Sequence, residues 1–154
     1  MSIESAIVTL ARNESMLTTI LTGGIYGYRE LGKRGIDPTN SVTASAYSLS
    51  NEFNILQPCC VVKVRSQVVD STRFDVKSQT TGLRGVVEFW LYDENNYTAI
   101  ENARAVIYAL FQSKTNANIG ITSLVNRLDG LRDESLNDAA LLRDDYSFTK
   151  TNNS

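Results

Sequence analysis

Two stretches of the chain carry apolar residues at every third or fourth position, the spacing of a helix with one buried face. The first covers residues 2–21, in one piece or two, and Gly23-Gly24 follows it as a stop signal. The second covers residues 96–112 and is rich in alanine, a strong helix former. The apolar stripe of the first stretch consists of Ile3, Ala6, Ile7, Leu10 and Ala11, continued by Met16, Leu17, Ile20 and Leu21.

Between these helices, and after the second one, the pattern changes to that of β-strands. β-branched and aromatic residues gather in short runs bounded by glycine, proline, aspartate and serine. The run over residues 85–92 is apolar on both faces, which indicates a central strand. In the last run, Leu142, Tyr146 and Phe148 are expected to point inward. We expect strands over residues 25–28, 59–69, 73–78, 85–92, 124–131 and 140–149.

This order of elements predicts the fold class. A helix, a strand, a long loop, several strands, a second helix and a closing hairpin favour an α+β domain over an alternating parallel architecture. We expect a mainly antiparallel sheet, with the N-terminal helix and one long helix packed on one face. Residues 1–150 are predicted to form a single domain, and residues 151–154 a polar tail.

The long loop over residues 29–56 is dominated by glycine, serine and threonine. Loops beyond ~12–15 residues are uncommon in compact domains and are usually functional or disordered. Arg29, Lys33 and Arg34 form a small basic cluster at its start. A solvated loop explains such a cluster, and so does contact with DNA or with an acidic partner. Between the two contacts we favour the protein partner, because the chain as a whole is slightly acidic.

The charge and residue content disfavour several classes of function. A net charge of −2 leaves no basic surplus for general binding of nucleic acid. The chain has no histidine, which removes Ser-His-Asp and Cys-His catalysis and histidine-ligated zinc. No apolar run approaches the ~20 residues of a membrane span, and the signal-peptide pattern is absent. Adjacent Cys59 and Cys60 would point to opposite faces of a strand, so we expect reduced thiols.

One group of acidic residues invites a catalytic interpretation. Paired carboxylates can hold Mg²⁺ for phosphoryl chemistry, so a metal-dependent phosphoesterase or nuclease using the Asp129–Asp145 region stays an alternative. Arginines alternate with the acids, however, and no calcium-loop spacing occurs, which favours a charged turn and solvated strand edges. We therefore predict no catalytic, metal or cofactor site. The acids are Asp129, Asp133, Glu134, Asp138, Asp144 and Asp145, and the arginines are Arg127, Arg132 and Arg143.

The layout as a whole resembles the tail terminator (tail completion) proteins of long-tailed bacteriophages. The resemblance is one of order and texture along nearly the whole chain, and it carries no catalytic residues. The long helix at 96–112 completes it. The stretches that carry it are LTGGIY at 21–26, QPCCVV at 57–62, VVEFWLYD at 86–93 and ALLRDDYSF at 140–148.

The resemblance implies a structural virion protein that needs no cofactor. Such a protein forms a ring, commonly a hexamer, that caps the finished tail tube and joins it to the neck or head connector. Its partners would be further copies of itself, the tail tube protein and a neck protein, with DNA only passing through the lumen and no membrane involved. It would be assembled in the host cytoplasm. A neighbouring neck or head–tail joining subunit is the close alternative.

Residues for contacts with other subunits are expected on the aromatic strand, the basic cluster and the two-sided strand. A small domain with apolar residues on both sides of a strand has surface to hide, and a head-to-tail contact that closes gives a ring. A tryptophan flanked by Phe89 and Tyr92, as Trp90 is, is more often a core residue than a contact residue. The expected contact residues are Ile25, Tyr26, Tyr28, Arg29, Lys33, Arg34 and Trp90.

Overall fold

The computed structural model describes residues 2–29, 56–70, 82–116, 119–134 and 138–151. In these residues the strands form one sheet in the order β1-β2-β3-β6-β5-β4. The helices are α1 (Ile3–Arg12), α2 (Ser15–Ile20) and α4 (Thr98–Phe111). The strands are β1 (Gly24–Gly27), β2 (Cys59–Asp70), β3 (Gly82–Asp93), β4 (Thr115–Asn116), β5 (Gly120–Asp133) and β6 (Ala139–Thr151).

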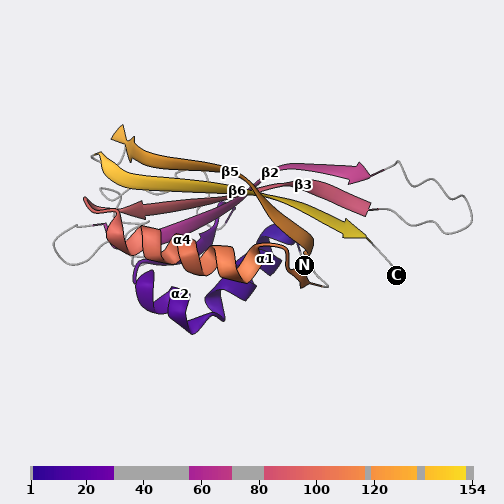
Figure 1. Cartoon of the computed structure of the whole chain (residues 1–154), viewed down its shortest axis with the longest axis horizontal. Coiled ribbons are helices and arrows are strands. Elements are labelled where there is room, and N and C mark those ends of the chain that lie inside the picture. Colours follow the sequence, from indigo (N-terminus) through magenta and orange to yellow (C-terminus); the bar gives the residue numbers. More distant parts are fainter. Residues whose placement is uncertain (1, 30–55, 71–81, 117–118, 135–137, 152–154) are drawn as a thin grey trace, which may run out of the picture.

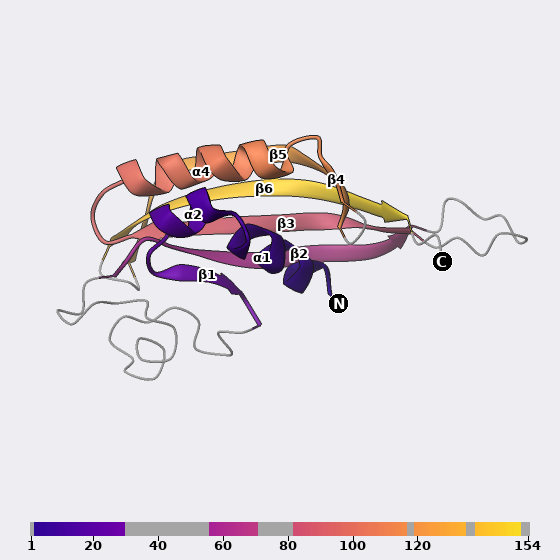
Figure 2. The same ribbon diagram turned by 90° about the horizontal axis from the view of Figure 1, so that it is seen from below.

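The described elements form two layers, with the three helices on the same side of the sheet (Figures 1 and 2). All neighbouring strands are antiparallel except β1 and β2, which run parallel. The α+β class with a mainly antiparallel sheet is therefore confirmed. Long strands β2, β3 and β6 continue past the ends of α1 and α4 toward the C-terminus (Figure 2).

The main core lies between the helices and the sheet. At its centre the ring of Phe89 lies 5.1 Å from that of Phe111 and 5.4 Å from that of Tyr146, measured between ring centroids. Leu142, Tyr146 and Phe148 are buried as expected. Alternate residues of β3, Val87, Phe89 and Leu91, join the same core, so the period of two along this strand decides which side chains meet the helices.

Local signals explain where α1 begins and how the chain enters β1. The Ser2 hydroxyl oxygen accepts a hydrogen bond from the backbone N–H of Ser5 at 3.1 Å and so caps α1. After α2, Gly24 adopts a φ of +103°, and a side chain there would collide with the Tyr26 ring. The glycine pair thus turns the chain out of the helix layer and into the sheet.

Two details differ from the sequence expectations, and two expected segments lie beyond the described residues. Met16 was expected to point inward and is 64% exposed, because the short α2 reaches the core through Leu17 and the residue after its end, Leu21. β3 begins at Gly82 and pairs directly with β2 along its whole length. The expected strand over 73–78 lies outside the described residues, and so does the long loop from 30 to 55.

Candidate assembly surface

The sheet face turned away from the helices bears no described element, and we call it the open face (Figures 1 and 2). Its side chains alternate with those of the core along β2, β3 and β6. An apolar cluster around Tyr92 and Leu141 occupies one end. Charged residues occupy the middle and the other end. The charged side chains of the open face are Lys63, Arg65, Arg84, Glu88, Arg143 and Asp145, and Trp90 lies among them.

Arg143 is the centre of an ionic network on this face. Its Nε and Nη2 donate hydrogen bonds to the two carboxylate oxygens of Asp145 at 2.9 and 3.0 Å, and Nη2 also reaches Glu88 Oε2 at 3.0 Å. Trp90 Nε1 donates to the other oxygen of Glu88 at 3.0 Å. The guanidinium of Arg143 lies 5.0 Å from the centroid of the Trp90 ring, a cation–π distance. Each partner thus holds the others in place.

Both carboxylates of the network are buried, although no described helix covers them. Glu88 is 3% exposed and Asp145 is 1% exposed. A buried carboxylate is costly unless it is paired, and here Arg143 pairs with both. The hydrogen bonds to Asp145, with the nearby negative charges, raise the pKa of Arg143. Arg65 Nη1 adds a second cation 3.5 Å from an oxygen of each acid, and its side chain stays 47% exposed.

The structure separates the residues that were expected to contact other subunits. Ile25 is 2% exposed and packs in the core beneath α1, so its assignment to a contact surface is wrong. The reason is strand alternation, which directs Ile25 inward and its neighbour Tyr26 to the open face. Tyr26 donates a hydrogen bond to the carbonyl of Gly23 at 2.7 Å. Tyr28 is exposed, with Lys63 Nζ 4.7 Å from its ring centroid.

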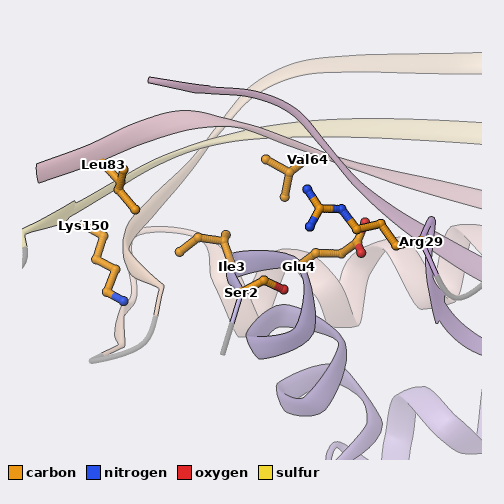
Figure 3. A pocket seen from close by; sticks show the side chains of 7 residues that line it. All are labelled: Ser2, Ile3, Glu4, Arg29, Val64, Leu83 and Lys150. Carbon is orange, nitrogen blue, oxygen red and sulfur yellow. The ribbon is translucent and has the colours of Figure 1, made fainter. Parts of the chain in front are cut away.

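The remaining expected residues fall in different places. Trp90 lies half-buried on the open face, as part of the ionic network. Lys33 and Arg34 lie outside the described residues. Arg29 lines a cavity of about 200 Å³ between the start of α1 and the far ends of β2, β3 and β6 (Figure 3). The other lining residues are Ser2, Ile3, Glu4, Val64, Leu83 and Lys150.

The acids proposed for metal-dependent chemistry are divided between the two sheet faces. Asp144 points to the helices, where Arg127 donates to both its oxygens at 3.1 and 3.0 Å and Arg104 Nε lies 3.1 Å away. Asp145 points to the open face, and Asp129 is exposed beside Arg104. Among the residues that the structure describes, no three acidic, cysteine or histidine side chains gather closely enough to hold a metal. This arrangement gives the alternative no support.

The apolar pattern of the sequence does not predict the network around Arg143. Glu88 falls within the two-sided run over residues 85–92, and Arg143 is one of the arginines that alternate with acids. A signal was present, because Glu88 interrupts an otherwise apolar run and Arg143-Asp144-Asp145 interrupts another. Charges inside apolar strands need partners of opposite sign, and two neighbouring strands can supply them. The register between β3 and β6, in which Trp90 lies opposite Arg143, brings these charged residues together.

Both cysteines are buried free thiols on opposite faces of β2, Cys60 toward the helices and Cys59 toward the open face. Burial raises the pKa of each thiol well above its ordinary value. Burial likewise raises the pKa of Tyr92 and of Tyr146. Such thiols are poor nucleophiles, because the thiolate is the reactive form.

These raised pKa values predict a loss of stability at alkaline pH. In the unfolded chain the thiols lose protons near pH ~8.5, whereas in the folded chain they keep them. Since the unfolded state then binds fewer protons, stability should fall as pH rises through that value, by about 1.4 kcal/mol per pH unit for each thiol. Urea unfolding across a pH series measures the slope. Cys60→Ala should roughly halve it between pH ~9 and ~10, and an unchanged slope would contradict the prediction.

The chain matches no protein-family model and no curated protein. None of the helices in the described part of the chain combines the length and the apolarity that crossing a bilayer requires.

Proposed function

We propose that this protein is a structural subunit of a bacteriophage tail terminator, a ring that caps the tail tube and joins it to the neck. The proposal rests on the resemblance of residues 21–26, 57–62, 86–93 and 140–148 to that family. The observation that carries it furthest is the open face. It is one side of a long sheet with no described cover, and its arginines pair with buried acids while remaining partly exposed. We expect another subunit to pack on this face.

The two edges of the sheet also differ in a way that suits assembly. The residues that flank α4 bind backbone groups of β5. Tyr97 donates a hydrogen bond to the carbonyl of Leu131 at 2.6 Å, and Gln112 accepts one from the N–H of Leu124 at 2.7 Å. At the other edge, β1 pairs with β2 only as far as Val62, whose carbonyl also accepts a hydrogen bond from the N–H of Tyr28. From there to Asp70 no described strand pairs with the outer edge of β2, and an open edge invites another strand.

A neck or head–tail joining subunit remains the close alternative, since it too would be a ring-forming virion protein without catalytic residues. The two differ in what they bind first. A terminator binds the end of a finished tail tube before any head is present, whereas a neck subunit joins the head and binds tails afterwards. Isolated tails and isolated heads from the same virus therefore separate the two functions.

The proposal is tested by the mass of the purified protein and by its binding to tails. Native mass spectrometry and negative-stain electron microscopy should show closed rings, either in solution or on addition of tail tubes. The protein should be found at one end of headless tails. A protein that stays monomeric with tubes present, and that is missing from purified tails, is not a terminator. Adding Mg²⁺ tests the enzymatic alternative, which expects a metal-dependent rise in melting temperature.

A further inference from the structure

Among the described side chains of β2, β3 and β6, the exposed charges of the open face are cations. Lys63 and Arg65 on β2 and Arg84 on β3 lie on this face, and we call them the basic patch. Arg65 and Arg84 are exposed, and Lys63 is half-buried against Tyr28. The two acids of the same face, Glu88 and Asp145, are buried and pair with both Arg143 and Arg65, so Lys63 and Arg84 supply the net positive charge. The patch therefore presents positive charge, although the whole chain has a net charge of −2.

The opposite charge gathers at one end of the sheet. Asp93 pairs with Ala140 and Asp133 pairs with Ala139, so the end of β3, the end of β5 and the start of β6 lie together. Figure 1 shows this end at the arrowheads of β3 and β5, with the arrowheads of β2 and β6 at the other end. Burial, together with the charge of Glu94, raises the pKa of Asp93. We call the acids here the acidic end: Asp93, Glu94, Asp133, Glu134 and Asp138.

The acidic end cannot reach the whole basic patch of its own chain. Arg84 and Asp93 both lie on β3, nine residues apart, which is about 30 Å in an extended strand. Charges separated by several Debye lengths hardly attract each other. The two surfaces are different patches of one molecule with complementary charge, and such a pair produces a head-to-tail contact that every further copy can repeat.

We propose that the acidic end of one copy docks on the basic patch of the next copy, and that this contact joins neighbouring subunits. Only the closure of the associated subunits into a ring depends on the proposed function; the contact itself does not. A second copy is favoured over nucleic acid because the complementary acids are present in the same chain. The net charge of −2 also disfavours binding to nucleic acid.

Two charge variants and their mixture test this contact. The basic-patch variant is Lys63→Gln with Arg84→Glu. The acidic-end variant is Glu134→Gln with Asp138→Asn, which removes charge without reversing it, and asparagine tolerates the positive φ of 57° at position 138. Each variant alone should associate roughly tenfold more weakly than the original chain or worse, since like charges face each other in the first variant and the attraction is lost in the second. Analytical ultracentrifugation at low and high salt measures the association, and circular dichroism verifies the fold.

The mixture gives the sharpest result. The acidic end is intact in the first variant and the basic patch is intact in the second, so one contact forms and neither partner can extend it. The mixture should therefore stop at a heterodimer, whereas each variant alone stays monomeric. Glu101→Lys, a charge reversal at an exposed position of α4 outside both surfaces, is the matched control and should associate like the original chain.

Several results would overturn the inference. If the original chain forms rings and both variants form them equally well, the contact lies elsewhere, and the terminator function stands. If the variants are monomeric and their mixture is too, the two surfaces do not meet. If Arg84→Glu removes binding to a DNA duplex and leaves self-association unchanged, the patch belongs to nucleic acid. If the original chain never associates, with or without tail tubes, the inference and the proposed function fail together.

Discussion

Replacing Arg143 by methionine is expected to lower the free energy of unfolding by about 3–5 kcal/mol, the usual cost of breaking a buried ion pair from one side. Glu88 and Asp145 would lose the guanidinium that pairs with both, and they are almost completely shielded from water. Methionine fills much of the arginine volume, so the loss reports charge rather than a cavity. Arg65, 3.5 Å away and half exposed, compensates in part.

Urea unfolding of variants on the same face measures this effect. Arg84→Met is the matched control, because Arg84 lies exposed on the same face, and its loss should stay within about 0.5 kcal/mol. Adding Glu88→Gln and Asp145→Asn to Arg143→Met should restore much of the stability, since the uncompensated charges then disappear. A loss for Arg143→Met no larger than that of the control would show that the network contributes nothing.

The alternation of apolar and polar residues predicted the long, regular strands. The alternation in 85–92 and the inward positions of 140–149 follow from a local rule, namely that successive side chains of a strand point to opposite faces. Leu142, Tyr146 and Phe148 are buried for this reason. The α+β class followed from the order of elements, which is also visible in the sequence.

Pairing and exposure were harder to predict, because they depend on contacts between distant residues. No local signal states that β1 runs parallel to β2 while every other described pair is antiparallel. Ile25 and Tyr26 are both apolar neighbours, and only the position of α1 decides which of them is buried. Arg143 and Glu88 are 55 residues apart, so their pairing follows from the register of β3 and β6.

Each face of the sheet contains a buried aspartate, but the surroundings that shield its ion pairs differ. On both faces β6 carries a buried aspartate, and arginines from other positions neutralise it. On the helix side α4 closes over the ion pairs. On the open face no described helix covers the network, and the side chains of Arg65 and Arg143 are 47% and 17% exposed. This asymmetry leaves cations at the surface of an otherwise acidic protein, and it is the physical basis for placing the subunit contact there.

Replacing Asp144 by asparagine is expected to cost about 3–5 kcal/mol, because it leaves Arg104 without its buried counter-charge. Asp144 is 1% exposed and contacts both Arg104 and Arg127. Arg127 can turn to water, since its side chain is 37% exposed, whereas that of Arg104 is only 8% exposed. Arg104 would keep the carbonyl of Leu128, at 2.8 Å from Nη2, and the carboxylate of Asp129 at Nη1, but Asp129 is 68% exposed and water screens its charge.

Asp129→Asn provides the matched control, because Asp129 pairs with the same arginine as Asp144 does but is exposed to solvent. Its side chain is 68% exposed, and a solvent-exposed ion pair contributes about 0–1 kcal/mol. Chemical unfolding of the two asparagine variants should thus differ by several-fold in lost stability. Asp144→Leu combined with Arg104→Met should be less damaging than Asp144→Asn alone, because it removes the stranded cation along with the acid. Equal losses for Asp144→Asn and Asp129→Asn would mean that burial of the pair has no energetic weight, and the account of both buried aspartates would have to be given up.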